Sequence, residues 1–304
     1  MRRFIFHILL FVLPVILVLI LIPVNKRQRY ISLKDDCFNH GIWLHDRIFE
    51  NTRPVDIAFI GSSHTINAVD DQQLETLLNV QQVNVLNLGY CRLGRNMDYV
   101  ILKELLEKKK PKQVILEVRE TESRYGHPIF PHVAAQKDVL LPALFFNRDI
   151  LKDAFTAIAY KIELIQDCFF SQQQAPVMDL NPYGFSGHTD TAKKQLLDDF
   201  FARRQQHSKK ESTFEHAFYN AYPKSYLEKI IALCKKNQVT LSFLYLPGYG
   251  SAYTQPEETA YYVKHGKLLL PPAIIFQTRS NWFDENHLNK NGSKALSQWL
   301  GKQL

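Results

Sequence analysis

Two stretches of the chain carry residue types that together could perform nucleophilic catalysis. The first is "GSSH", residues 61–64, which follows an apolar run; the second contains Asp284 and His287, three positions apart near the C-terminus. A serine hydroxyl attacks a carbonyl when a base takes its proton, and a histidine base needs an acid that fixes its tautomer. An Asp-x-x-His turn supplies both partners from one loop.

The "GSSH" turn also has an explanation that requires no chemistry. Glycine permits a tight turn, and a serine at the start of the following helix is a good N-cap. Its oxygen would then lie near backbone N–H groups and the positive end of the helix dipole. Taken alone, the turn is better explained as a cap. The presence of Asp284 and His287 is what favours a catalytic serine.

Four short apolar runs predict the strands that would position these residues. They are nearly continuous in apolar residues, which is typical of strands covered on both faces. Helical stretches at 70–78, 96–108 and 224–236 separate them, and this alternation implies right-handed βαβ crossovers. The predicted strands are Val55–Ile60, Val83–Leu88, Gln113–Val118 and Thr240–Leu246.

We therefore expect an α/β fold over residues 31–304, with a mainly parallel central sheet flanked by helices in a flavodoxin-like, three-layer arrangement. Residues 121–222 interrupt the alternation and are predicted to form an insertion over the sheet, with helices at 139–170 and 191–206. Residues 61–64 would lie at the carboxyl edge of the sheet, where open α/β sheets bind ligands.

The N-terminus predicts a membrane anchor over residues 1–30. Phe4–Val24 is apolar except for His7, and a helix of that length spans ~30 Å of hydrocarbon. A cleaved signal peptide is the alternative, but the apolar run exceeds the ~7–15 residues of a signal-peptide core and no small-x-small cleavage site follows it. Basic residues flank both ends, so charge does not fix the orientation. The short tail before a long domain favours an exported domain.

Composition excludes some functions. The 46% hydrophobic and 22% charged residues are typical of a globular protein. The net charge of +7 could indicate an anionic partner, but no dense basic tract with interleaved aromatic residues predicts nucleic-acid binding. The cysteines neither define a disulfide framework nor exclude a bridge. No metal site or cofactor is predicted, because neither the cysteines nor the histidines of the insertion have metal-ligand spacing. These residues are Cys37, Cys91, Cys168, Cys234, His127, His132 and His188.

The "GSSH" stretch, together with "DENHLNKNG" before the last helix, resembles the SGNH (GDSL-type) serine hydrolase superfamily. In that family the nucleophile stands two residues after a glycine, and the last block is Asp-x-x-His. The resemblance implies that Ser63, not Ser62, is the nucleophile, with His287 as general base and Asp284 as its orienting acid. It covers the sheet strands and both ends of domain 31–304, but not the insertion.

The middle blocks of the family match less closely. After the second strand, "NLGYCRLGRN" offers Gly89 or Gly94 where the family places a glycine whose N–H helps form an oxyanion hole. After the third strand, "EVRETES" lacks the asparagine of the family's Gly-x-Asn-Asp. Arg119 could replace that donor, or it could pair with Glu117 or Glu120 at the strand end. Loss of one oxyanion donor typically costs ~10²–10³ in rate.

The apolar N-terminus, "GSSH" in place of Gly-Asp-Ser, and "HLN" followed by glycine look like the membrane-anchored branch of the superfamily. That branch includes the D-alanyl-lipoteichoic acid biosynthesis protein and SGNH-like partners of polysaccharide O-acetyltransferases. The resemblance implies a serine O-acyltransferase or esterase acting on acyl groups of a cell-envelope polysaccharide. It implies a single-pass protein of a bacterial inner or cytoplasmic membrane with an extracytoplasmic domain. The implied partners are an acyl donor, a glycan acceptor, the membrane and a multi-spanning membrane-bound O-acyltransferase.

Two other classes remain open at this point. In the first, the altered third block marks a weak or inactive SGNH-fold accessory protein that binds glycan or a membrane O-acyltransferase. In the second, the positive charge makes the chain a basic surface-binding module, whose binding would weaken steeply with salt. His64 could line the pocket, although a loop histidine is more often exposed. Residues 246–253 ("LPGYGSAY") are predicted as a pocket loop.

Overall fold

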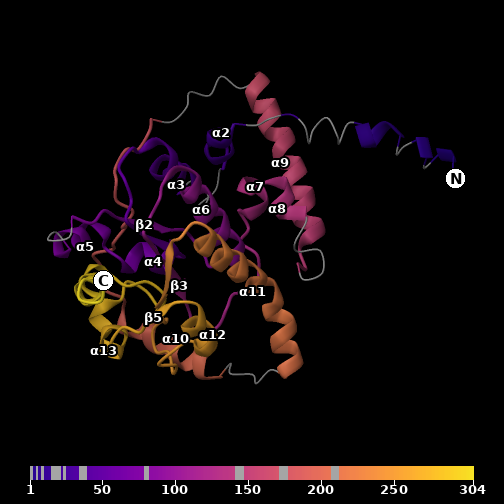
Figure 1. Cartoon of the computed structure of the whole chain (residues 1–304). Coiled ribbons are helices and arrows are strands. Elements are labelled where there is room, and N and C mark those ends of the chain that lie inside the picture. Colours follow the sequence, from indigo (N-terminus) through magenta and orange to yellow (C-terminus); the bar gives the residue numbers. More distant parts are fainter. Residues whose placement is uncertain are drawn as a thin grey trace. The chain divides into compact units, whose positions relative to one another are not determined.

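The computed structural model describes residues 3–4, 6–7, 10–14, 22, 25–33, 40–78, 82–140, 147–170, 177–206 and 212–304. The chain forms two compact units. One comprises residues 1–45 and 128–177, and the other comprises residues 46–127 and 178–304. Figure 1 shows the course of the chain, and the sheet belongs entirely to the second unit.

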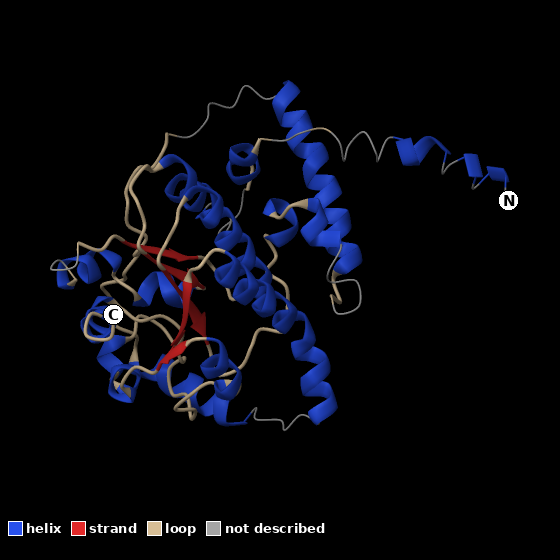
Figure 2. Ribbon diagram, in the orientation of Figure 1, coloured by secondary structure: helices blue, strands red, loops and turns tan. Residues whose placement is uncertain are grey.

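A five-stranded parallel sheet forms the centre of the second unit (Figure 2). Its order is β2-β1-β3-β4-β5, and each neighbouring pair of strands is parallel. The strand order reverses beside β1, and ligands in such doubly wound sheets bind at the carboxyl ends of the strands near that reversal. The strands are β1 (Ile57–Gly61), β2 (Val85–Gly89), β3 (Gln113–Val118), β4 (Thr240–Tyr245) and β5 (Lys267–Leu269).

Helices cover both faces of this sheet. On one face, α4 (Ser63–Ala68) and α5 (Asp71–Leu77) pack against the C-terminal helix α14 (Lys290–Leu300). On the other, α6 (Arg95–Lys108) packs against α11 (Thr213–Lys236). The crossover from β2 to β3 runs in the opposite direction to that from β1 to β2, so right-handed connections put the two groups on opposite faces. The second unit therefore has three layers.

Several shorter elements complete the second unit. Two of them, α13 and η4, pack against each other and against α14. The indole of Trp282, which follows η4, is buried and donates from Nε1 to the Phe276 carbonyl at 2.9 Å, which ties this region to the core. The elements are η2 (Asp46–Glu50), α10 (Lys194–Gln206), α12 (Thr259–His265), α13 (Ala273–Gln277) and η4 (Arg279–Asn281).

The first unit is helical in its described residues. The predicted helix over 139–170 is two helices, α8 (Gln136–Leu140) and α9 (Ile150–Phe170), and residues 147–149 before α9 are not helical. Helix α9 packs on α7 and α8, while α2 packs on α3 and α7. The remaining helices of this unit are α2 (Lys26–Ile31), α3 (His40–His45) and α7 (Phe130–Val133). The predicted insertion at 121–222 is thus divided between the two units, and its bounds stay a prediction.

One part of the predicted fold class is wrong. We expected a transmembrane helix over Phe4–Val24, but the described residues contain no helix that is long and apolar enough to cross a membrane. A span requires ~20 successive helical residues, whereas the residues described as helical in this region are 3–4, 6–7 and 10–14. Residues 5, 8–9, 15–21 and 23–24 of the predicted span lie outside the described residues.

Candidate active site

The structure brings Ser63, His287 and Asp284 within hydrogen-bonding distance of one another. Ser63 Oγ lies 2.8 Å from His287 Nε2, and His287 Nδ1 lies 2.8 Å from Asp284 Oδ2. When Nδ1–H donates to the carboxylate, Nε2 is left to accept the serine hydroxyl. Ser63 and His287 are 224 positions apart in the chain, so only the fold can join them.

The loop that carries the acid and the base is closed by its own backbone. Asp284 Oδ1 accepts the N–H groups of Asn286 at 2.7 Å and His287 at 2.8 Å. The His287 carbonyl accepts the N–H of Phe283 at 2.9 Å. Carboxylate oxygens commonly organise turns in this way. The position of the imidazole is therefore set locally, before any contact with Ser63.

Asp284 is suited to orient the histidine at neutral pH. Burial by itself would raise the pKa of its carboxyl group, but the hydrogen bonds from the His287 ring and from the Asn286 and His287 N–H groups hold that pKa below its usual value. The carboxyl group is therefore ionised at neutral pH. An ionised Asp284 can stabilise the positive charge that His287 gains when it takes a proton.

A second carboxylate holds the serine turn. Glu117, at the end of β3, is buried, and its Oε2 accepts the Ser62 N–H at 2.7 Å and the Thr65 hydroxyl at 2.6 Å. The Ser62 hydroxyl donates to Oε1 at 2.8 Å. A buried carboxylate requires such donors, because an unpaired charge is costly away from water. Glu117 thus joins β3 to the first turn of α4.

The two adjacent serines have different environments. Ser62 is the N-cap of α4: its Oγ accepts the His64 N–H at 3.1 Å while its hydroxyl donates to Glu117. Ser63 is the first residue of α4, and its Oγ contacts His287 instead. The helix-cap interpretation of the "GSSH" turn therefore applies to Ser62, and the catalytic interpretation applies to Ser63.

Gly61 makes room for the Glu117 carboxylate. A Cβ atom at position 61 would lie 2.4 Å from Glu117 Cβ and 2.4 Å from Thr65 Oγ1. Contacts this short do not occur in proteins without displacement of the neighbouring atoms, and one of the two neighbours belongs to the strand-end carboxylate. The glycine of the motif is thus required by close approach as well as by the turn.

The predicted oxyanion-hole glycines lie in different settings. The Gly89 N–H donates to Asn87 Oδ1 at 2.9 Å, so this group is already committed. Gly94 is the N-cap of α6, and among the described residues no hydrogen bond joins it to the triad. The N–H of Ser63 itself, in the first turn of α4, makes no hydrogen bond with any described residue. It is therefore an available donor next to the reacting oxygen.

Arg119 directly follows the last residue of β3. Its guanidinium is 3.9 Å from Glu117 Oε1 and 3.7 Å from Glu120 Oε2, which are long ion-pair distances. It also lines a cavity of about 380 Å³ with Leu93 and Tyr253, from the segments that follow β2, β3 and β4. Of the two alternatives for Arg119, the structure has the pairing with Glu117 and Glu120. A role of Arg119 as an oxyanion donor stays a prediction.

Two histidines of the second unit, His64 and His127, are buried. His64 is buried, not exposed, and its ring centroid lies 5.4 Å from that of His287. His127 is also buried, and it supports the segment after β2 through hydrogen bonds to the Cys91 carbonyl and from its own N–H to Asn96 Oδ1. Sequence spacing gave no signal for His127, because its partners lie more than 30 positions away.

Other predicted features can be placed as well. Residues of the 246–253 loop line a pocket together with Tyr245 and Phe276. Cys91 is disulfide-bonded and Cys234 is a buried free thiol. Within the described part of the chain, no group of three or more His, Cys, Asp or Glu residues is placed to hold a metal ion.

Comparison with known proteins does not identify the chain. No protein-family model matches it, and no curated protein matches it. The case for its function depends on the geometry of the site and on the motif resemblance.

We predict that Glu117→Gln destabilises the protein by about 1–3 kcal/mol, because an amide NH₂ in place of one carboxylate oxygen would leave a buried donor facing the Ser62 N–H or a hydroxyl. Urea unfolding measures the change. The control is Glu285→Gln, the same substitution in the histidine loop. The Glu285 carboxylate has no partner among the described residues. Equal stability of Glu117→Gln and the parent would contradict this account.

We also predict that His127 contributes to acid destabilisation. Burial lowers its pKa to about 4, below the ordinary value of about 6.5. The unfolded chain therefore takes up the proton first, and stability is lost as the pH falls from about 6.5 to 4, by up to about 3 kcal/mol.

The measurement is the free energy of unfolding against pH for the parent, His127→Gln and the control His265→Gln. The parent and the control should lose more stability across this window than His127→Gln. Parallel pH curves for all three proteins would show that folding does not lower the pKa of His127.

Proposed function

We propose that the chain is a serine O-acyltransferase or esterase, in which Ser63 accepts an acyl group and passes it to a hydroxyl group or to water. The observation that carries this proposal is the 2.8 Å contact between Ser63 Oγ and His287 Nε2, continued at 2.8 Å from His287 Nδ1 to Asp284. A nucleophile, a base within hydrogen-bonding distance and an acid that orients the base are the requirements of covalent acyl transfer.

In the first half-reaction, His287 Nε2 takes the Ser63 proton while Oγ attacks the carbonyl carbon of an ester. The Ser63 N–H is placed to stabilise the negative oxygen of the tetrahedral intermediate. The carbon–oxygen bond to the donor then breaks, and the leaving oxygen takes the proton from His287. The products are the donor alcohol and an acyl ester on Ser63.

In the second half-reaction, an acceptor hydroxyl loses its proton to His287 and attacks the acyl-serine. The Ser63 oxygen leaves and recovers the proton, so the site returns to its starting state. Asp284 stays ionised throughout and stabilises the imidazolium. Transfer requires a sugar hydroxyl as acceptor, and hydrolysis requires water.

A cell-envelope polysaccharide is the acceptor class that the motif resemblance favours. The disulfide at Cys91 supports an extracytoplasmic location, because disulfides persist mainly in oxidising compartments. We propose a multi-spanning O-acyltransferase as the partner that would supply acyl groups. That partner rests on the resemblance alone.

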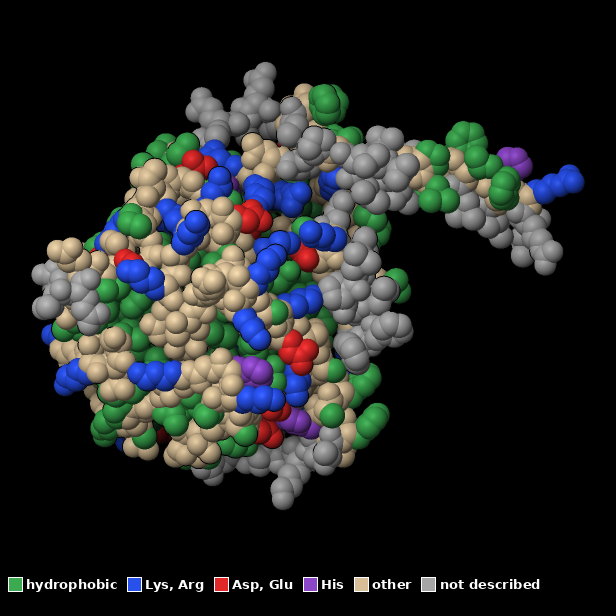
Figure 3. All heavy atoms as spheres, viewed as in Figure 1, with side chains coloured by type: hydrophobic (Ala, Val, Ile, Leu, Met, Phe, Trp, Pro, Cys, Tyr) green, Lys and Arg blue, Asp and Glu red, His purple; other side chains and the backbone are tan. Residues whose placement is uncertain are grey.

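A weak or inactive accessory protein is the second candidate, and two observations favour it. The N–H of Gly89 is committed to Asn87, and the asparagine of the family's third block is absent. A site with one donor fewer would be ~10²–10³ slower. A basic surface-binding module has less support, because on the face shown in Figure 3 the Lys and Arg side chains are spread out with acidic side chains among them.

The test is to incubate the full chain with p-nitrophenyl acetate and to follow nitrophenolate release and intact mass. We expect a burst of nitrophenolate and one added acetyl group. Ser63→Ala should lose both, and Asp284→Asn should slow acylation by about 10³–10⁴-fold because it favours the wrong histidine tautomer.

Ser123→Ala is the control for a serine outside the triad. An acetyl group that persists in Ser63→Ala would exclude Ser63 as the nucleophile. If the parent gains no acetyl group and releases no nitrophenolate, the accessory-protein candidate is favoured.

A further inference from the structure

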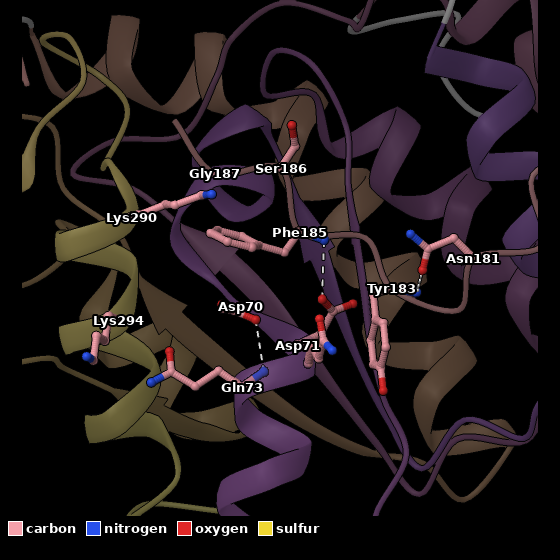
Figure 4. A pocket seen from close by; sticks show the side chains of 11 residues that line it. Asp70, Asp71, Gln73, Asn181, Tyr183, Phe185, Ser186, Gly187, Lys290 and Lys294 are labelled. Carbon is pink, nitrogen blue, oxygen red and sulfur yellow. Dashed lines mark hydrogen bonds between the residues drawn. The ribbon is translucent and has the colours of Figure 1, made fainter. Parts of the chain in front are cut away.

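A groove of about 900 Å³ opens beside the serine and histidine segments in the second unit. Figure 4 shows its walls, which are the start of α5, the segment 181–187 and one side of α14. Its volume is in the range of known ligand sites. Nothing in the acylation chemistry described above uses it.

The acidic side chains of the groove are committed to backbone groups. Asp71 is buried, and it accepts the N–H groups of Asn87 at 2.8 Å, Gly184 at 2.7 Å and Phe185 at 3.2 Å. Asp70 caps α5 by accepting the Gln73 N–H at 2.9 Å. These carboxylates therefore hold the walls of the groove together.

The two lysines of the groove are not committed. Lys290 and Lys294 stand four positions apart on the same side of α14, and neither ammonium group has a hydrogen bond or ion pair with a described residue. Residues at this spacing are neighbours on a helix surface. The groove thus has two lysines along its α14 wall, with the Lys290 side chain extended toward Gly187 (Figure 4).

An apolar ring lies next to these charges. A Cβ atom at Gly187 would lie 2.3 Å from Phe185 Cζ and 3.0 Å from Lys290 Cγ, so the glycine lets both side chains approach the same point of the backbone. Figure 4 shows the Phe185 ring directed toward the α14 side of the groove. A flat ring beside the Lys290 side chain suits a ligand that combines sugar rings with negative charge.

The segment that walls the groove also contacts the elements that carry the triad. The Ser186 N–H donates to the Ile66 carbonyl of α4 at 3.2 Å, one turn from Ser63. The His188 ring stacks on Phe283 with centroids 3.8 Å apart, beside Asp284. The Lys290 N–H donates to the His188 carbonyl at 2.8 Å. Residues 186–188 therefore link the groove to α4 and to the loop that carries Asp284.

We propose that this groove is the acceptor subsite and that it binds an anionic saccharide, whose carboxylate or phosphate groups pair with Lys290 and Lys294. This inference rests on the proposed acyl-transfer function, because only an enzyme that transfers an acyl group needs a subsite for an acceptor. Charge-assisted hydrogen bonds supply the affinity, and the Phe185 ring supplies an apolar surface for a sugar face.

The experiment measures binding by calorimetry to the Ser63→Ala chain, so that acylation plays no part in it. The probes are hexagalacturonate for carboxylate, pentamannose phosphate for phosphate, and neutral maltohexaose. At least one anionic probe should bind more tightly than maltohexaose. Its affinity should fall by about tenfold or more in Lys290→Gln/Lys294→Gln, since each charged contact accounts for about a factor of ten.

The matched control is Lys235→Gln/Lys236→Gln, which removes two exposed lysines from the last turn of α11 and should bind as Ser63→Ala does. Failure of both anionic probes to bind, or equal binding after the Lys290 and Lys294 changes, would overturn the proposal. Equally tight binding of inorganic phosphate would reduce the groove to a simple anion site. Because p-nitrophenyl acetate tests Ser63 separately, binding without acylation would reject the acyl-transfer function and leave an anion-binding groove.

Discussion

The serine turn depends on the charge of Glu117 and on the lack of water around it. A carboxylate buried at the end of β3 must find donors nearby, and it finds them in the N–H and hydroxyl of Ser62 and in the hydroxyl of Thr65. All of these donors flank Ser63 in the sequence. Satisfying this one charge therefore fixes the first turn of α4 and leaves the Ser63 hydroxyl to His287. Gly61 belongs to the same constraint, since any Cβ there would displace the carboxylate.

The histidine side of the site is organised independently, around Asn289. This buried residue caps α14, accepting the N–H groups of Asn291 and Gly292, and its NH₂ group donates to the Ser280 carbonyl at 2.8 Å. A Cβ at Gly292 would lie 2.5 Å from the Asn281 carbonyl oxygen. The "HLN" and following glycine of the motif thus join the helix to the loop before it. These two separately braced segments meet where α4 packs against α14, where the His64 and His287 rings approach each other, and where Ser63 Oγ lies 2.8 Å from His287 Nε2.

Much of the fold could be predicted because β1 to β4 are buried on both faces and are therefore mostly apolar. β5 was missed, since an edge strand of three residues that begins with the exposed Lys267 gives no periodic signal. The triad residues could be proposed because the Asp284–His287 turn is local. The Glu117 contacts could not, because a strand-end glutamate meets Ser62 only after the parallel register of β1 and β3 is set. The hydrogen bond from the Gly89 N–H to Asn87 likewise could not be predicted from a motif, because it depends on backbone geometry.

The most direct test of the assembled triad needs no knowledge of the substrate. The native chain is treated with a fluorophosphonate, which reacts with activated serines, and the modified peptide is mapped by mass spectrometry beside His287→Ala and a urea-unfolded sample. The account predicts one phosphonyl group on Ser63 of the native chain, with Ser62 unmodified and both other samples unreactive. Modification of Ser63 to the same extent without His287, or no modification of the native chain, would contradict the claim that the fold makes Ser63 a nucleophile.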